Sequence, residues 1–192
     1  MIIGITGGIG AGKSIVSKIL RTKGYPVYDC DSEAKRIMDA SDSIKERLNT
    51  LIHPEIVVNG IINRKLLAEI VFNDVTMLNT LNSIVHKAVA EDIRAISSSG
   101  IYPTLFVETA ILYQSNLDML VDGVWEVTAP VEIKIQRVIN RNSCSRDDVL
   151  ARIKSQEQQE CNRRHKSTFY IINDDVHAVL PQVQELLSGI KS

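Results

Sequence analysis

The stretch GITGGIGAGKS, residues 4–14, decides the fold class of this chain. Gly7, Gly12, Lys13 and Ser14 have the spacing G-x-x-x-x-G-K-[ST], which is typical of a phosphate-binding loop. The run MIIGIT before it is short, apolar and β-branched, so it predicts a buried strand. The run SIVSKILRTK after it places apolar residues on one helical face. The motif therefore stands between a strand and a helix, as its chemistry requires.

The residue types in this loop suit a bound triphosphate. Glycines let the backbone turn tightly and bring its N–H groups close to an anion, and the following helix points its positive end into the loop. Lys13 can reach the β- and γ-phosphates, and the Ser14 hydroxyl can bind Mg²⁺. An ordinary Gly-rich turn is one alternative. A dinucleotide-binding G-x-G-x-x-G loop is a weaker one, because its spacing is not met and Lys13 and Ser14 stay unexplained. The loop alone does not choose among a kinase, an ATPase and a GTPase switch.

Composition excludes several classes of partner. The 192 residues are 44% hydrophobic and 23% charged, with a formal net charge of −1, so no overall positive field recruits nucleic acid or a membrane surface. We see no apolar run of membrane-spanning length and no signal-peptide pattern. Cys30, Cys144 and Cys161 lack metal-ligand spacing and predict free thiols. We expect a cytoplasmic protein, a monomer or a weak homo-oligomer, with a small-molecule substrate.

The order of the expected elements predicts an α/β fold with a parallel sheet. YPVYDCD is a second strand, so the chain begins with a βαβ unit, and three further strands are TLFVET, GVWEVTA and TFYIIND. A long helical block interrupts the strands and has a turn signal at Asn59-Gly60. We therefore expect a nucleotide-binding core at residues 1–31 and 101–192, and a helical insertion at residues 32–100.

Two strand ends carry acids that could act in catalysis. Asp29 and Asp31 alternate along an extended chain, so both would point to one side, and one could accept a proton from an attacking hydroxyl. The alternative is that Asp31 or Ser32 caps the following helix. Glu108 ends the apolar strand TLFVE and is similar to a Walker-B carboxylate that holds Mg²⁺, the alternative being a solvated acid.

Basic residues are dense between about residues 137 and 166. Guanidinium groups suit a transferring phosphoryl group, and a basic flap over ATP would exclude water, so this segment is expected to be a lid. A solvated helix whose charges pair with Glu157 and Glu160 is the alternative, and for any single arginine it is at least as good. The basic residues run from Arg137 to Lys166 and include Arg141, Arg146, Arg152, Lys154, Arg163 and Arg164.

An ordered set of further segments resembles the dephospho-coenzyme A kinase family over nearly the whole chain. After the glycine loop, DCDSEAKRI is similar to an Asp-Ala-Asp stretch that opens a helix, and GIINRKLLAEIVF to a Leu-Asn-Arg segment. LNSIVHKAV is similar to a Leu-x-x-Ile-x-His-Pro segment, and IQRVINRN and ARIKSQ to parts of the family's lid. The loop is common to many families, whereas this ordered combination is much more specific.

The resemblance implies a five-stranded parallel P-loop core, an inserted acceptor-binding domain and a lid. It also implies the reaction, in which MgATP phosphorylates the ribose 3′-hydroxyl of dephospho-CoA in the last step of coenzyme A biosynthesis. By position, Asp31 matches the base, Arg64 an acceptor-site arginine, Arg141 a lid arginine near the nucleotide and Asn173 an asparagine near the adenine. We expect Lys13 to assist catalysis, Ser14 to hold the metal and Glu108 to lie at the substrate. The residues expected to bind ATP in the loop are Gly8, Gly10, Ala11, Gly12, Lys13, Ser14 and Ile15.

The chain departs from the family pattern at a few positions. Ile15 replaces a Thr, Lys87 a Pro, and Phe169 an Asp, while Ala110 and Gln114 replace residues of an Asp-x-Pro-Leu-Leu-x-Glu pattern. Another nucleoside or nucleotide kinase is the nearest alternative function. A non-catalytic nucleotide switch or nucleotide-binding module is a second alternative, although the chain has no Asn-Lys-x-Asp pattern for reading guanine.

Overall fold

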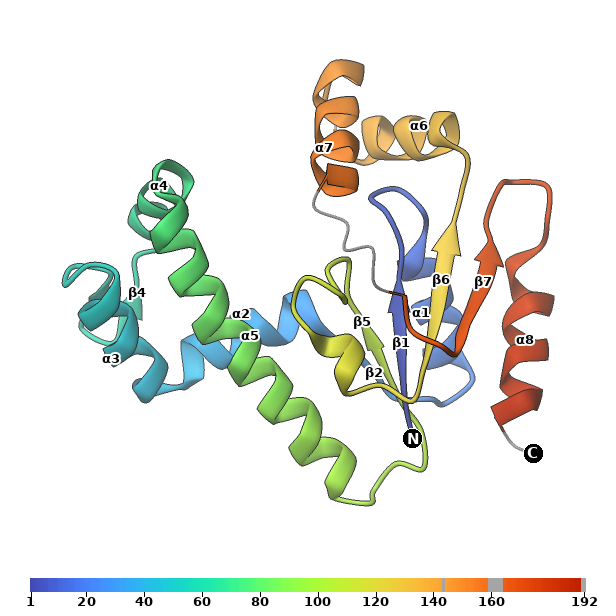
Figure 1. Ribbon diagram of the computed structural model, residues 1–192, viewed down its shortest axis with the longest axis horizontal. Coiled ribbons are helices and arrows are strands. Elements are labelled where there is room, and N and C mark those ends of the chain that lie inside the picture. The colour runs from blue at the N-terminus through green and yellow to red at the C-terminus, as the bar shows by residue number, and fades with distance from the viewer. Residues whose placement is uncertain (143, 159–163, 191–192) are drawn as a thin grey trace. The chain divides into compact units, whose positions relative to one another are not determined.

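The chain forms two compact units, residues 1–28 with 99–192, and residues 29–98. The structure, a computed structural model, describes residues 1–142, 144–158 and 164–190 (Figure 1). The boundaries expected from the sequence lie a few residues later along the chain. In the described residues no helix is both long and apolar enough to cross a membrane.

The first unit is built on a five-stranded parallel sheet, as the sequence predicts. The strand order is β2-β5-β1-β6-β7, with β1 in the centre between β5 and β6. All residues of β1 are buried, because a central strand of a parallel sheet is covered on both faces. The strands are β1 (Ile2–Thr6), β2 (Val27–Asp29), β5 (Leu105–Glu108), β6 (Gly123–Thr128) and β7 (Thr168–Ile172).

Helices α1 (Lys13–Thr22) and α8 (Val179–Ile190) pack against this sheet. Their core side chains, among them Leu20 and Leu187, join an apolar cluster that includes Phe106 and Trp125. Trp125 is 2% exposed and is therefore a core residue. A short 3-10 helix, η1 (Leu117–Met119), follows β5 in the chain.

Helices α6 (Val131–Asn142) and α7 (Arg146–Gln158) lie at the carboxyl ends of β1 and β6, beside the glycine loop (Figure 1). We call them the α6–α7 pair. They share an apolar cluster of Ile135, Val138, Val149 and Ile153, against which Ile9 of the loop packs. A single apolar residue thus attaches the glycine loop to both helices.

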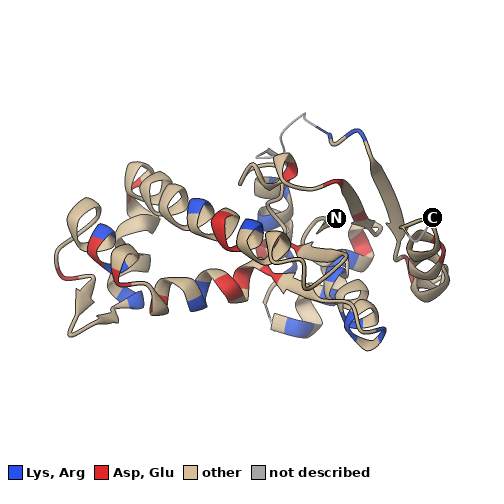
Figure 2. Ribbon diagram, turned by 90° about the horizontal axis from the view of Figure 1, so that it is seen from below, with Lys and Arg blue, Asp and Glu red and all other residues tan. Residues whose placement is uncertain are grey.

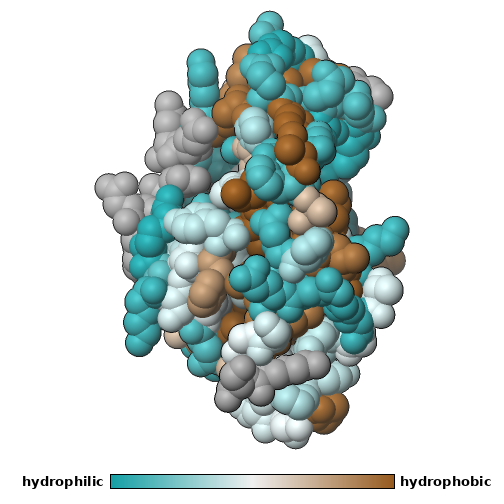
Figure 3. Space-filling view, turned by 90° about the vertical axis from the view of Figure 1, so that its right-hand side faces the viewer, coloured by the Kyte–Doolittle hydropathy of each residue, from teal (hydrophilic) through white to brown (hydrophobic). Residues whose placement is uncertain are grey.

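Strand β7 is an edge strand, and it exposes more apolar surface than the others. Phe169, Tyr170 and Ile172 are each at least 43% exposed, whereas Ile171 is buried. Figure 3 shows hydrophobic side chains interspersed with hydrophilic ones on the side of the molecule where β7 and α8 lie.

The second unit is helical apart from one small hairpin. Asn59 and Gly60 have φ values of 51° and 76°, so the predicted turn is confirmed; it joins β3 (Val57–Val58) to β4 (Ile61–Ile62). Leu48, Ile56 and Ile84 lie at the centre of its apolar core. The helices are α2 (Cys30–Ala40), α3 (Asp42–Leu51), α4 (Arg64–Asn73) and α5 (Val75–Ser98).

Ion pairs join the helices of this unit on its surface. Arg36 of α2 pairs with Asp92 of α5 at 3.0 Å, and Figure 2 shows acidic and basic residues interspersed along these helices. Such exposed pairs are worth about 0.2–1 kcal/mol each, so the apolar core carries most of the stability.

Candidate active site

The glycine loop needs glycine for steric reasons that the structure makes specific. Gly10 and Gly12 have φ values of 77° and 99°, in the region that L side chains rarely adopt. A Cβ on Gly10 would lie 2.5 Å from the carbonyl oxygen of Lys134, and one on Gly12 would lie 2.0 Å from Nδ2 of Asn173. Lys134 and Asn173 therefore leave no room for a side chain at these two positions of the loop.

Lys13 lies across the loop. Its Nζ donates to the carbonyl oxygen of Gly7 at 2.8 Å and to that of Gly8 at 3.4 Å. Helix α1 begins at Lys13, and its N-cap, Gly12, makes no side-chain capping bond. The N-terminal turn of a helix presents amide donors and a positive dipole end, so this end of α1 is suited to binding an anion.

Two loop amides are used within the loop itself. Ala11 N–H donates to the Gly8 carbonyl at 3.1 Å, and Ile15 N–H donates to the Gly12 carbonyl at 3.0 Å. These bonds shape the turn. Both residues belong to the set expected to bind ATP, and that role stays a prediction.

Asn173 holds the loop from the end of β7. It is 5% exposed, its Nδ2 donates to the Ala11 carbonyl at 2.8 Å, and its backbone N–H donates to the Thr128 carbonyl at 2.8 Å. The expected role of Asn173 near the adenine stays a prediction. In this structure its amide shapes the phosphate loop.

Arg137 of α6 also bonds to the loop and to Asn173. Its Nη1 donates to the Asn173 carbonyl at 3.0 Å and to the Ala11 carbonyl at 3.4 Å, and its Nη2 donates to Oδ1 of Asn173 at 3.1 Å. Arg137 also pairs with Asp175. Arg141, which the family resemblance matched to a lid arginine, is exposed and donates to Oδ1 of its neighbour Asn142 at 3.1 Å. The two arginines are one helical turn apart on one face, so the pattern of α6 could not choose between them.

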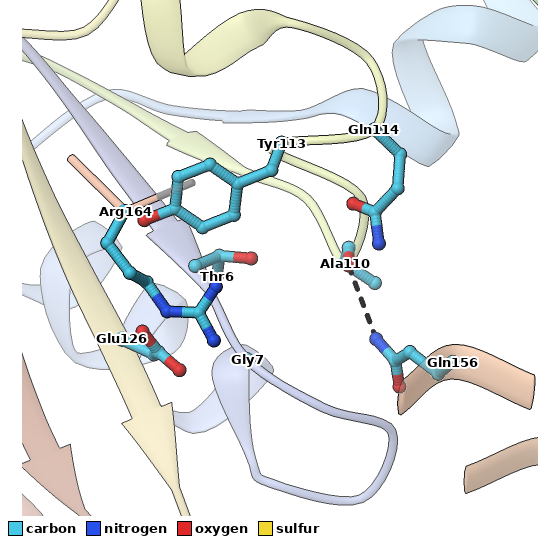
Figure 4. Close-up of a pocket in the computed structure, with 8 residues that line it drawn as sticks. All are labelled: Thr6, Gly7, Ala110, Tyr113, Gln114, Glu126, Gln156 and Arg164. Carbon is cyan, nitrogen blue, oxygen red and sulfur yellow. Dashed lines mark hydrogen bonds between the residues drawn. The ribbon is translucent and has the colours of Figure 1, made fainter. Parts of the chain in front are cut away.

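A polar cleft opens beside the loop (Figure 4). The guanidinium of Arg164 lies over the Tyr113 ring, 5.5 Å from its centroid, and the Tyr113 hydroxyl accepts from His165 N–H at 3.3 Å. Arg164 is one of the basic residues that the sequence singled out, and the structure places it at this cleft. The residues that line the cleft are Thr6, Gly7, Ala110, Tyr113, Gln114, Glu126, Gln156 and Arg164.

Glu126 is an acid of the site that sequence reasoning missed. It lines this cleft and also a neighbouring one with Gly8 and Lys134. Before its final Thr, its strand, GVWEVT, is otherwise apolar, and an acid in such a strand was the available signal. Glu108 ends β5 as expected and pairs in register with Ile5 of β1, but it does not line either of these clefts.

Lys134 is a second missed residue. It stands in the first turn of α6, and its Nζ would lie 3.5 Å from a Cβ on Gly8. Its ammonium therefore lies against the glycine loop. In the described part of the chain it makes no ion pair within 4.0 Å. Sequence reasoning missed it because one lysine in an amphipathic helix is not distinctive.

The acidic segment after β2 differs from the expected extended chain. Strand β2 ends at Asp29, and α2 begins at Cys30, so the alternation proposed for Asp29 and Asp31 is wrong. Asp29 is the N-cap: its Oδ1 accepts from Asp31 N–H at 3.0 Å and Ser32 N–H at 3.2 Å. The expectation that Asp31 or Ser32 caps the helix is also wrong. Capping thus occupies the Asp29 carboxylate, while Asp31 is exposed in the first turn of α2.

Arg64 lies in the second unit, at the start of α4. Its Nη2 donates to both carboxylate oxygens of Asp39, at 2.8 Å each, and both side chains are about half exposed. The guanidinium is accessible, and Asp39 orients it. Its role toward an acceptor stays a prediction.

Comparison with known proteins identifies the family. A sequence-family model described as dephospho-CoA kinase matches residues 1–178. The chain is 36% identical over 190 residues to the dephospho-CoA kinase of Porphyromonas gingivalis, covering 99% of this chain and 94% of that protein. It is 37% identical over 193 residues to the dephospho-CoA kinase of Thermus thermophilus, covering 98% and 93%.

Solved structures support the same fold. A Thermus thermophilus protein, 34% identical, superposes with a TM-score of 0.77 over 100% of this chain and 96% of its own. A shikimate kinase from Acinetobacter baumannii, at 16% identity and a TM-score of 0.54, covers 99% and 92% and shares the fold. From the match over residues 1–178 and the identity to these relatives, the chain belongs to the dephospho-CoA kinase family.

Proposed function

We propose that this chain transfers the γ-phosphoryl group of ATP to the ribose 3′-hydroxyl of dephospho-CoA, giving CoA and ADP. The observation that carries the proposal is the glycine loop at the N-terminus of α1, with Lys13 across it, in a chain that matches the family over residues 1–178. The family match does not favour another nucleoside or nucleotide kinase, or a non-catalytic switch.

Binding of ATP would begin at the loop. Gly8 and the amides and glycines of residues 10–15 would surround the β- and γ-phosphates, and Lys13 would exchange its bonds to the Gly7 and Gly8 carbonyls for phosphate oxygens. Lys134 would add a second positive charge beside Gly8. Such positioning and neutralisation of charge account for most of the catalysis in phosphoryl transfer.

Mg²⁺ fits the donors that this site offers. The Ser14 hydroxyl stands at the start of α1, the Glu108 carboxylate ends β5, and the Glu126 carboxylate lines the cleft beside Gly8. All three offer the hard oxygen ligands that Mg²⁺ prefers. The described residues contain no cluster of three or more His, Cys, Asp or Glu that could hold a metal by itself. Mg²⁺ usually binds through one or two protein ligands together with substrate phosphates, so here the phosphates of ATP would complete its coordination and it would neutralise charge on the transferring group.

Asp31 would accept the proton of the ribose hydroxyl. Because Asp29 takes the capping role, the Asp31 carboxylate is left for this task. Arg64 in the second unit would bind an anionic group of the acceptor, with Asp39 as its competing partner. Arg141 would contact the nucleotide, and residues 137–166 would act as a lid.

A direct assay tests the proposal. Purified protein is incubated with MgATP and dephospho-CoA, and CoA is measured by mass, with Lys13→Met as the inactive control. We expect CoA and ADP in equal amounts. No product above the Lys13→Met background would refute the proposed reaction, and turnover with a nucleoside instead would assign the chain to another acceptor.

We also propose a cytoplasmic location and a monomeric or weakly associating state. The location rests on Cys30 and Cys144, which form no disulfide in the described part of the chain, as is usual in a reducing compartment. Light scattering at several protein concentrations measures the second point, and cell fractionation the first.

A further inference from the structure

The Gln156 side chain lies between two backbone groups from distant parts of the core unit. Its Oε1 accepts from Ile9 N–H at 2.8 Å, and its Nε2 donates to the Ala110 carbonyl at 3.3 Å (Figure 4). Ile9 belongs to the glycine loop, Ala110 follows Glu108 at the end of β5, and Gln156 stands in α7. One amide thus connects three segments that surround the cleft.

The contact with the loop has two parts. The Ile9 side chain packs on the apolar cluster of the α6–α7 pair, while its N–H is bound by Gln156. Val149, Ile153 and Gln156 follow one another at helical spacing, with Val149 and Ile153 buried, so Gln156 continues the inward face of α7. The spacing favours an apolar residue at this position. The presence of an amide there therefore indicates that its hydrogen bonds are needed.

The position of Ile9 in the chain explains how Gln156 can hold the loop and leave its phosphate-binding amides available. Its N–H precedes the segment Gly10–Ile15 that matches the family's ATP-phosphate loop, so Gln156 fixes the edge of the loop without using those amides. At the same time it fixes the carbonyl of Ala110, two residues after the Glu108 acid. The loop and the segment after β5 are thereby held at a set separation across the cleft.

We propose that Gln156 is a positioning residue for phosphoryl transfer, whose amide holds the phosphate loop, the Ala110 segment and α7 in one arrangement. The proposal rests on the proposed function, because the arrangement it preserves is that of bound ATP and its metal. Only an amide of this length meets both contacts. Glu keeps the acceptor but loses the donor, Leu loses both, and Asn is one methylene too short.

The test compares Gln156→Leu and Gln156→Glu with wild type and with Gln184→Leu. Gln184 is the matched control, because its side chain is exposed on α8, outside the loop and the α6–α7 pair. We expect Gln156→Leu to lower kcat about 10²-fold, with KM for ATP changed less than about threefold, since a small displacement of the loop disturbs the geometry of the reacting groups more than it weakens binding. Gln184→Leu should keep wild-type kcat. Equal kcat in the two Leu variants would overturn the proposal.

Hydrogen exchange at the Ile9 amide, followed by NMR in the free protein, tests the contact without any turnover. We expect exchange several-fold faster in Gln156→Leu than in wild type, and close to wild type in Gln156→Glu, which retains the acceptor. Unchanged exchange in Gln156→Leu would overturn the proposal. If that variant does not fold, the near-isosteric Gln156→Glu decides, with lowered kcat and a protected Ile9 amide as the expected result and wild-type kcat as the contrary one. Absence of CoA formation by wild type would instead refute the proposed function, and the exchange result would still stand on its own.

Discussion

Nδ2 of Asn173 donates a 2.8 Å hydrogen bond to the backbone carbonyl of Ala11, which lies 162 residues earlier in the chain. This bond ties the end of edge strand β7 to the loop that follows central strand β1. Together with Arg137, it makes the shape of the phosphate loop depend on residues from the far end of the sequence.

Replacement of Asn173 by Ala should therefore affect both stability and nucleotide binding. The Ala11 carbonyl would keep only the 3.4 Å contact with Arg137, so we expect a loss of about 1–3 kcal/mol in the free energy of unfolding, together with a higher KM for ATP. Urea unfolding and steady-state kinetics measure the two effects. Asn140→Ala on the exposed side of α6 is the control, with a change within about 0.5 kcal/mol. Equal effects of the two variants would contradict the role of Asn173 in holding the phosphate loop.

Gly12→Ala and Gly24→Ala separate backbone strain from crowding of the loop. Both glycines have positive φ, 99° and 84°, so each substitution should cost about 1–2 kcal/mol in strain. Only at Gly12 does the new Cβ meet another atom, Nδ2 of Asn173 at 2.0 Å, whereas nothing lies within 4 Å at Gly24. Calorimetric titration with MgATP should show loss of binding in Gly12→Ala alone.

Asp31→Asn and Asp29→Asn separate catalysis from helix capping. We expect Asp31→Asn to reduce kcat by about 10²–10⁴-fold with little change in KM for ATP, as for loss of a general base. Asn is an adequate N-cap, so Asp29→Asn should leave stability nearly unchanged, whereas Asp29→Ala should cost about 1 kcal/mol. Rate measurements at saturating ATP and thermal unfolding of all three variants provide the check. An Asp31→Asn enzyme with wild-type kcat would remove the assigned base.

Lys134→Met tests the second positive charge at the loop. A charge-assisted hydrogen bond to phosphate is worth about 1.5–3 kcal/mol, so its loss should weaken ATP binding by about tenfold or more. Lys23→Met, at the exposed C-terminal end of α1, is the matched control and should bind ATP as wild type does. Titration with a fluorescent ATP analogue measures both. Identical affinities would mean that Lys134 does not contact the nucleotide.

His86 of α5 should make stability depend on pH. Burial lowers its pKa below the ordinary value of 6.5, since desolvation disfavours the charged imidazolium. The unfolded chain then binds the proton more readily than the folded chain, so this contribution to stability is present above pH 6.5 and is lost as the pH falls through the lowered pKa. As the pH is lowered, the urea concentration at the midpoint of unfolding should therefore fall less steeply in His86→Gln than in wild type. Parallel curves would exclude His86 as the cause.

The sequence by itself determined the nucleotide-binding loop, the α/β class and the five strands. These follow from local patterns, because the glycine spacing, the β-branched runs and the amphipathic helices each act over a few neighbouring residues. The same local reasoning failed at Asp29, where a three-residue strand and a capping carboxylate replaced the expected longer strand.

Only the tertiary structure decided which side chains meet at the loop. The strand order β2-β5-β1-β6-β7 places β6 beside β1 and β7 beside β6, and so brings Glu126, Lys134 and Asn173 to the carboxyl end of β1. Position along α6 places Arg137, rather than Arg141 one turn further on, against the loop, and the packing of α7 on Ile9 places Gln156 there. Contacts between residues more than a hundred positions apart depend on how the elements pack against one another, which no local pattern encodes.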